Sequence, residues 1–255
     1  MKKENNQIPN GIQARGVVLS LLNLGFEQKY KGVIAISRGY FARTLCYYGH
    51  KLQVPITIVL VNSSRLSPVK YCERLGGTIL VAKNIFEAHK TAMKIAQQKG
   101  LVFLDGIDHP DMIIGQSTMA VDMLPELKTI DAVILPTQFD GCALTMGIAM
   151  VIKNRYPNMH IIEARIRNSD LFIEAIRSMN LNRTVLRNEE AKAYTWHFDN
   201  EGVLESLFDN CVIVDDHSAA QTFKRLTEDR GIDFTTTIGF AAILSGQLDY
   251  LKGRK

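Results

Sequence analysis

The sequence predicts an α/β fold with two lobes, each an open, twisted, mostly parallel sheet that carries helices on both faces. Short runs rich in β-branched residues alternate with longer segments of helical spacing. The runs are almost wholly apolar, so both faces of each sheet need cover. A turn-rich segment, residues 105–110, divides the runs into two groups. Strands that alternate with helices run parallel through right-handed crossovers, which completes the fold class.

Seven runs have the length and composition of strands. They occupy residues 32–37, 56–61, 78–81, 102–104, 131–136, 160–164 and 211–214.

Three of the intervening segments have clear helical patterns. Residues 12–24 and 41–52 each carry apolar side chains along one stripe. The next helix has start and stop signals: Asn84 is followed three residues later by Glu87, and Gly100 stands where the helix would end.

Composition and charge narrow the classes of function. The 255 residues are 46% hydrophobic and 22% charged, which excludes intrinsic disorder. The net charge of +4 is spread without a basic run longer than Lys2-Lys3, so we expect no nucleic acid and no membrane partner. No apolar run is long enough for a signal peptide or a membrane span. We therefore expect a soluble, cytoplasmic protein.

The cysteines support the same compartment. They show no Cys-x-x-Cys spacing and stand among apolar residues, so we expect reduced, buried thiols at Cys46, Cys72, Cys142 and Cys211.

Common catalytic motifs are missing from the sequence. There is no Gly-rich phosphate loop, dinucleotide fingerprint, Gly-x-Ser-x-Gly elbow or His-Glu-x-x-His pair. The histidines lack ligand spacing, so we expect no metal site. His109, in Asp-His-Pro-Asp, and Asp215-Asp216 suit acid–base chemistry, but such positions more often begin helices or turns, and we expect capping.

Four segments, in order along nearly the whole chain, resemble the serine/threonine dehydratase and serine racemase family. The clearest is residues 108–118, Asp-His-Pro-Asp-Met-Ile-Ile-Gly-Gln-Ser-Thr, which is similar to the family's Asp-x-Pro-x-Val-Ile-x-Gly-Gln-x-Thr. The others are residues 54–59, 67–77 and 241–255. The resemblance implies the tryptophan-synthase β-like fold (pyridoxal phosphate, PLP, fold type II), with a large domain of residues 1–31 and 112–255 and a small domain of residues 32–111. It also implies a dimer, either a homodimer or a heterodimer with an active paralogue.

The family's catalytic lysine has no counterpart. Residues 11–17, Gly-Ile-Gln-Ala-Arg-Gly-Val, resemble the family's Ser-Phe-Lys-x-Arg-Gly-Ala, and Arg15 and Gly16 hold the register. Gln13 therefore falls on the lysine position. An amide nitrogen cannot form the imine with the cofactor aldehyde or carry a proton near neutral pH, so we expect no catalytic residue.

The element that holds the cofactor ring is also altered. The family's Ser-x-Gly-Asn-His is matched here by Ser37 and Gly39, whereas Tyr40 replaces Asn and Phe41 replaces His. Added ring volume in a filled pocket costs about 1–3 kcal/mol. We expect the aromatic side chains to fill the pocket for the cofactor ring.

The phosphate loop keeps one glycine, Gly141, and places the carboxylate of Asp140 where the phosphate would lie. Like charges about 4 Å apart repel by about 4 kcal/mol at an effective dielectric constant of 20. The sequence also ends before the family's last strand, so we expect no partner for the pyridine nitrogen. Ser37, Gly39 and Gly141 are thus the remaining cofactor-binding positions, and no cofactor is expected.

These departures predict a catalytically inactive homologue of the PLP-dependent serine/threonine ammonia-lyases and serine racemases, acting as a binding or subunit-interaction protein. Two alternatives stay open. A residual L-serine/L-threonine ammonia-lyase would need a substitute amine from Lys31, Lys70 or Lys153. A small-molecule or anion binder would use the interlobe cleft, with Arg38 and Arg165 as donors.

Overall fold

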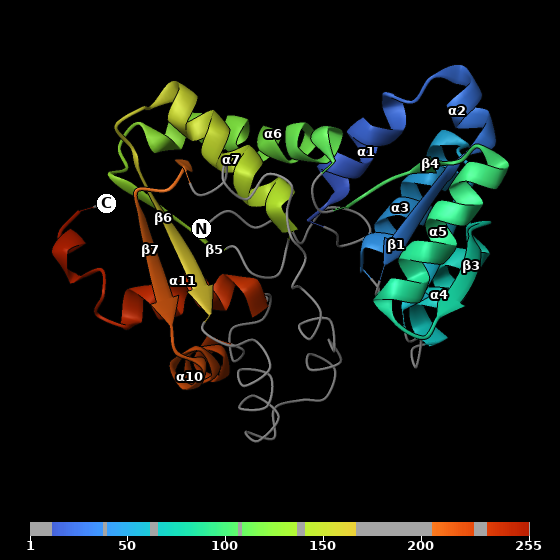
Figure 1. The fold of residues 1–255 in the computed structure, drawn as a ribbon. Helices are drawn as coiled ribbons and strands as arrows, with labels where there is room; N and C mark the ends of the chain where they lie inside the picture. Colours follow the sequence, from blue (N-terminus) through green and yellow to red (C-terminus); the bar gives the residue numbers. More distant parts are fainter. Residues whose placement is uncertain are drawn as a thin grey trace. The chain divides into compact units, whose positions relative to one another are not determined.

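Two parallel β-sheets, one in each half of the chain, organise the structure (Figure 1). The chain divides into two compact units, Met1–Thr118 and Met119–Lys255, and each is described by itself. This computed structural model describes residues 12–37, 40–61, 66–106, 109–136, 141–166, 206–226 and 234–254. All seven predicted strands are present in it, and every strand pairing is parallel. The predicted fold class is confirmed; the predicted domain boundaries stay a prediction.

The first unit holds a four-stranded sheet in the order β3-β2-β1-β4. Its elements are α1 (Ala14–Leu22), α2 (Phe26–Lys31), β1 (Val33–Ser37), α3 (Tyr40–Leu52), β2 (Ile56–Val61), α4 (Leu66–Arg74), β3 (Thr78–Ala82), α5 (Ile85–Lys99), β4 (Val102–Phe103) and the start of α6 (Pro110–Leu127).

Helices cover both faces of this sheet. On one face α5 presents three alanines at helical spacing to buried residues of β1 and β2, forming a core that includes Ile34 and Val59. On the other face α3 packs so closely that a Cβ on Gly49 would overlap the side chain of Ile56. Small residues on the helices let the backbones approach, and the apolar strands are buried between them.

The predicted capping signals of α5 are confirmed. Asn84 Oδ1 accepts a hydrogen bond from the backbone N–H of Glu87 at 2.9 Å, and Glu87 Oε2 accepts from Lys83 N–H at 2.8 Å. Gly100 ends the helix in the left-handed conformation, with φ of 67°. Such a φ favours glycine because a Cβ would be strained there.

The second unit holds a three-stranded sheet in the order β5-β6-β7. Its strands are β5 (Ala132–Pro136), β6 (His160–Ile166) and β7 (Asn210–Val214), and its helices are α7 (Gly141–Arg155), α10 (Asp216–Leu226), α11 (Phe234–Leu244) and the 3₁₀ turn η2 (Asp249–Leu251).

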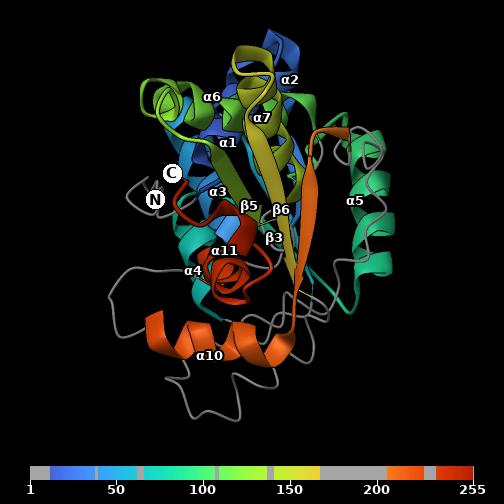
Figure 2. The ribbon, with the colours of Figure 1, turned by 90° about the vertical axis from the view of Figure 1, so that its left-hand side faces the viewer.

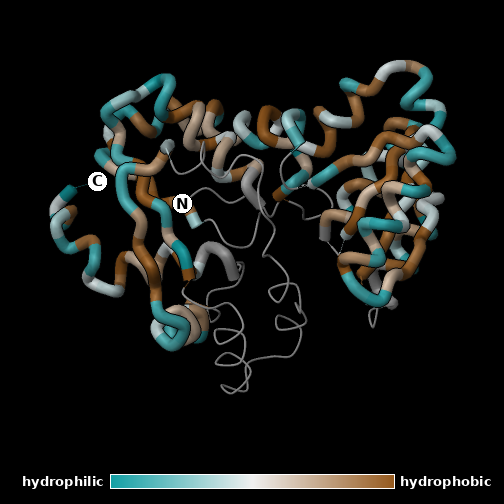
Figure 3. Tube along the Cα trace, viewed as in Figure 1, coloured by the Kyte–Doolittle hydropathy of each residue, from teal (hydrophilic) through white to brown (hydrophobic). Residues whose placement is uncertain are grey.

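Helices flank this second sheet (Figures 1 and 2), and they pack against it in two hydrophobic cores. One joins β6 and β7 to α10 and α11, with Phe223 and Ile238 among its fully buried side chains. The other joins β5 and β6 to α7 and the end of α6, around Ile152 and Ile161. Hydrophobic residues dominate the strands of both sheets (Figure 3).

The edge strands correct one expectation about burial. β3 and β7 lie at sheet edges, and each carries an exposed apolar side chain: Val81 is 61% and Ile213 50% accessible. Cys46 and Cys72 are buried free thiols as expected, but Cys211 on β7 is exposed. The prediction of buried thiols is wrong for Cys211, because every second residue of this edge strand points away from the core that Val212 and Val214 join. The side chain of Cys142 lies outside the described residues.

Both suspected acid–base segments act as helix caps. His109 Nδ1 accepts the backbone N–H of Asp111 at 3.2 Å at the start of α6, and Asp111 Oδ1 accepts from Asn23 Nδ2 at 2.9 Å. Asp215 Oδ1 accepts the backbone N–H of Ser218 at 2.9 Å at the start of α10. Hydrogen bonds from the hydroxyl and the backbone N–H of Ser218 hold the pKa of Asp215 below its ordinary value. The capping interpretation is confirmed.

Candidate functional site

Ser37 lies at the topological switch point of the first sheet. The order β3-β2-β1-β4 means that the chain leaves β1 toward β2 and later returns to the other side of β1 as β4. In open parallel sheets, ligands bind beyond the carboxyl ends of the strands at such a switch point. Ser37, the last residue of β1, is 6% exposed, and its Oγ accepts the backbone N–H of Ala42 at 3.0 Å. This hydroxyl therefore ties β1 to the first turn of α3.

Only some of the other predicted residues of this segment are among those that the structure describes. Gly39 and Arg38 lie outside the described residues, and Tyr40 begins α3 with a side chain that also lies outside them. Phe41 is buried, and its ring lies against Gly106, where an added Cβ would be 2.7 Å from Phe41 Cζ. An aromatic ring packed on a glycine thus occupies the region just beyond β4, next to the end of β1.

Gln13 lies in the turn that precedes α1. It is the N-cap residue of this helix, with φ of −83° and ψ of 1°, and its side chain makes no capping hydrogen bond. Its carbonyl oxygen accepts the N–H of Val17 at 3.0 Å, so the backbone enters the helix directly. The turn places a carboxamide at the position that the family resemblance assigns to lysine.

Gln116 holds both ends of this turn. Its Nε2 donates to the carbonyl oxygen of Ile12 at 2.8 Å, and its Oε1 accepts the backbone N–H of Gly16 at 3.1 Å. The residue is 1% exposed, so these bonds satisfy a buried amide. The sequence singles out Gly115-Gln116 only by resemblance. This clamp could not be seen from the sequence, because it joins residues about a hundred positions apart.

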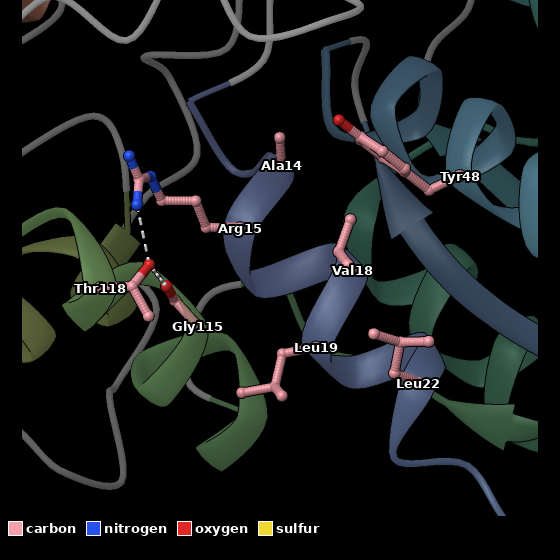
Figure 4. A pocket seen from close by; sticks show the side chains of 8 residues that line it. All are labelled: Ala14, Arg15, Val18, Leu19, Leu22, Tyr48, Gly115 and Thr118. Atoms are coloured by element: carbon pink, nitrogen blue, oxygen red, sulfur yellow. Dashed lines mark hydrogen bonds between the residues drawn. The ribbon is translucent and has the colours of Figure 1, made fainter.

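α1 and α6 cross at two glycines beside the clamp. A Cβ on Gly115 would lie 2.5 Å from Gly16 Cα and 2.6 Å from the carbonyl oxygen of Arg15. The Arg15 guanidinium donates to Thr118 Oγ1 at 3.0 Å (Figure 4). The two helices therefore meet backbone to backbone within the first unit.

A mostly apolar groove of about 310 Å³ runs along α1 next to this crossing (Figure 4). Burial, together with the neighbouring Tyr47, raises the pKa of the Tyr48 phenol on its α3 side. The sequence contains no sign of this groove, because three helices distant in sequence build it. Its lining comprises Ala14, Arg15, Val18, Leu19, Leu22, Tyr48, Gly115 and Thr118.

In the second unit, Gly141 is the first residue of α7, directly after the segment of the predicted phosphate loop. Asp140 lies outside the described residues. Arg165 on β6 has an ion-pair partner: its Nε lies 2.5 Å from Oε1 of Glu163, whose side chain is 4% exposed. Arg165 thus neutralises a buried carboxylate. Ser37 and Gly141 belong to different units, so the interlobe cleft stays a prediction.

Two of the three candidate substitute lysines are in ion pairs. Lys31, just before β1, is 2.7 Å from Glu27 on the same helix. Lys153 Nζ donates to both oxygens of Asp209, at 2.8 and 2.7 Å, and to the carbonyl oxygen of Met159 before β6. Both amines lie toward the amino ends of their strands. Lys70 is exposed on α4.

In the part of the chain that the structure describes, no three His, Cys, Asp or Glu side chains gather as metal ligands. Within the same residues, none of the helices has the length and apolar character needed to cross a membrane.

Two curated enzymes are similar over most of the chain. The L-threonine ammonia-lyase of Thermotoga maritima is 26% identical over 261 residues, which covers 100% of this chain and 64% of that enzyme. The biosynthetic L-threonine dehydratase of Salmonella typhimurium is 28% identical over 233 residues, which covers 90% of this chain and 45% of that enzyme. The chain thus spans about half to two thirds of the length of these relatives.

Solved structures agree with the predicted fold. The processed form of threonine deaminase isoform 2 from Solanum lycopersicum superposes with a TM-score of 0.81 and 23% identity, covering 100% of this chain and 75% of that one. The serine racemase of Dictyostelium discoideum has a TM-score of 0.81 at 19% identity, covering 99% and 82%. The family model for pyridoxal-phosphate dependent enzymes matches residues 1–254. The chain therefore belongs to the pyridoxal-phosphate dependent enzyme family.

Proposed function

We propose that this protein is a catalytically inactive member of its family and acts as a binding or subunit-interaction protein. One observation carries the proposal: the turn that Gln116 clamps presents the carboxamide of Gln13 where the family resemblance has the lysine. Only a primary amine can condense with the cofactor aldehyde and then be displaced by a substrate amine. A carboxamide also lacks a usable proton near neutral pH, so it cannot replace lysine as an acid or base.

The rest of the donor set does not fit the cofactor either. Phe41 replaces a polar residue of the family, and its ring is already packed against Gly106. Ser37 keeps its hydroxyl, but that oxygen accepts a backbone N–H of α3. By resemblance, Tyr40 takes the place of the Asn that binds the ring hydroxyl, and Asp140 would repel the phosphate.

A residual ammonia-lyase, of the kind named for the Thermotoga relative, would need a substitute amine. Lys31 and Lys153 are engaged by Glu27 and Asp209, and both lie toward the amino ends of their strands, whereas ligands in such folds lie beyond the carboxyl ends. Lys70 is solvated on α4. No specific contact favours any of the three as the imine-forming residue.

An anion binder would need free guanidinium groups. Arg165 pairs with the buried Glu163, so recruiting it for a ligand would leave a carboxylate unpaired in the interior. Arg38 lies outside the described residues. Of the three candidate functions, that of a catalytically inactive binding or subunit-interaction protein therefore has the best support.

The test is to incubate the purified chain with pyridoxal phosphate, reduce with borohydride and map any adduct by mass spectrometry. We expect no imine absorbance band and no specific lysine adduct. An active L-threonine ammonia-lyase serves as the positive control. The variant Gln13→Lys should still release no ammonia from serine or threonine, because Tyr40 and Asp140 remain. A stoichiometric adduct on the unmodified sequence, or ammonia release by this single variant, would overturn the proposal.

The interaction role includes self-association or pairing with an active paralogue. Light scattering coupled to size-exclusion chromatography tests the first, and co-expression with a tagged active relative tests the second. We expect a stable dimer in at least one of these experiments. A chain that stays monomeric in both would refute the subunit-interaction part of the proposal while leaving the inactive site untouched.

A further inference from the structure

Two thiols meet between α3 and α4 in the first unit. Cys46 and Cys72 are free and almost fully buried, at 1% and 0% exposure. The point where a Cβ of Gly77 would stand is 2.9 Å from Cys46 Sγ and 3.1 Å from the carbonyl oxygen of Cys72, so the Cys46 sulfur lies beside the backbone of Cys72. The two thiol groups lie close enough for each to perturb the pKa of the other. The sulfur atoms are thus near neighbours on two packed helices.

A cation lies next to this pair. The Arg43 guanidinium lies over the ring of Tyr71, 4.7 Å from its centroid. Arg43 is one helical turn before Cys46 in α3, and Tyr71 directly precedes Cys72 in α4. Arg43 Nε is buried and has no hydrogen-bond partner among the described residues. The positive charge of Arg43 favours the thiolate form of Cys72 over the thiol.

The two sulfurs differ in acidity. The interaction with Cys46, aided by the charge of Arg43 and opposed by burial, lowers the pKa of the Cys72 thiol. The interaction with Cys72, together with burial, raises the pKa of Cys46. The position of Arg43 over Tyr71, the neighbour of Cys72 in sequence, and the lowered pKa together favour Cys72 as the attacking thiol, with Cys46 as the second thiol.

We propose that Cys46 and Cys72 form a peroxide-sensitive dithiol that closes to an intramolecular disulfide between α3 and α4. The Cys72 thiolate attacks one oxygen of a hydroperoxide, the O–O bond breaks, and the released hydroxide or alkoxide takes up a proton. The Cys46 sulfur then attacks the sulfenic sulfur of Cys72. The S–O bond breaks, the thiol proton of Cys46 leaves with the hydroxyl group as water, and the S–S bond forms. Both thiols are oxidised while one peroxide is reduced.

The burial of the pair favours a small oxidant. Hydrogen peroxide is close to water in size, whereas a tripeptide disulfide would need the helices to separate. The bond would fasten α4 to α3, the helix that Ser37 caps, and so would stabilise this unit against unfolding. The proposal is independent of whether the family cofactor binds.

The experiment treats the full chain with hydrogen peroxide, blocks the remaining thiols and maps its peptides without reduction. We expect one linked pair of peptides containing Cys46 and Cys72, a mass loss of two hydrogen atoms and a rise in melting temperature that dithiothreitol reverses. The variant Cys142→Ser with Cys211→Ser should behave alike, because the pair is intact. Arg43→Gln should form the bond several-fold more slowly at neutral pH.

Single variants Cys46→Ala and Cys72→Ala serve as controls for the assignment. Each should lose the linked peptide while the circular dichroism spectrum stays unchanged. The wild-type peptide map does not depend on their folding. Oxidation confined to the exposed Cys211, or a Cys72 sulfenic acid that persists without linkage to Cys46, would refute the proposal.

Discussion

Gly115 and Gly16 touch backbone to backbone where α6 crosses α1, because a Cβ on Gly115 would lie only 2.5 Å from Gly16 Cα. The neighbour of each glycine contributes to the same crossing: Gln116 binds the backbone of the turn, and Arg15 binds Thr118. The closeness of the helices thus sets the geometry of the turn that carries Gln13.

Gly115→Ala should destabilise the protein, because its methyl group would collide with backbone atoms that cannot rotate away. Overpacking of this kind costs about 1–3 kcal/mol or more. Urea unfolding measures the change. Gly239→Ala, within α11, is the matched control. A Cβ at position 239 would have only Ile134 Cγ2 nearby, at 4.0 Å, so this variant should stabilise the helix. Equal effects of the two variants would contradict the backbone contact.

Gln116→Met should release the turn while keeping the volume of the side chain. The carbonyl oxygen of Ile12 and the N–H of Gly16 would lose their partner, and each buried polar group left unpaired costs about 1–3 kcal/mol. Hydrogen exchange should rise at Gly16 and Val17. Gln98→Met, on the exposed side of α5, should leave stability and exchange unchanged. Unaltered exchange at Gly16 in the first variant would show that the clamp is dispensable.

Asp209 should make the second unit sensitive to acid. Burial alone would raise the pKa of this carboxyl, but hydrogen bonds from Lys153 and from the N–H of Ile161 outweigh it, and the pKa is lowered overall. A folded-state pKa below the unfolded value of about 3.9 stabilises the fold above that pH, and the contribution is lost as the pH falls through the folded value.

The measurement is the free energy of unfolding of Asp209→Asn against wild type between neutral and acid pH. The wild type should be more stable near neutrality, and the gap should shrink below about pH 4. Asp249→Asn removes the exposed pair with Lys252 and should change little at any pH. A gap that is constant with pH would argue against the charge of Asp209 as its source.

Asn84→Ala should cost about 0.5–2 kcal/mol, because the first turn of α5 loses the acceptor for Glu87 N–H. Asn84→Asp keeps an acceptor at the same point and should retain most of the stability. Thermal unfolding monitored by circular dichroism separates the two. Equal losses in both variants would mean that the cap hydrogen bond is not the cause.

Local signals in the sequence predict most of the fold. All seven strands and the α5 caps follow from patterns within a few residues, such as Asn84 with Glu87 and the glycine at position 100. Burial at sheet edges is less predictable, since Cys211 has the same apolar neighbours in sequence as a core residue would. The order of strands decides its exposure, and strand order is a long-range property.

The candidate site is predictable only where resemblance supplies a register. Gln13 and Ser37 can be singled out from their neighbours in sequence. The Gln116 clamp, the groove along α1 and the pairing of Cys46 with Cys72 join residues that no local pattern connects. The partners of Lys153 and Arg165 are equally invisible before folding. Tertiary contacts, rather than residue types, decide which side chains are available for chemistry.

The amide bridge from Gln116 reaches only main-chain atoms on either side of position 13. What that position bears is therefore irrelevant to whether the surrounding loop keeps its shape. Evolution could exchange a reactive side chain there for an inert one without destabilising the fold, and such a change would not alter the backbone structure.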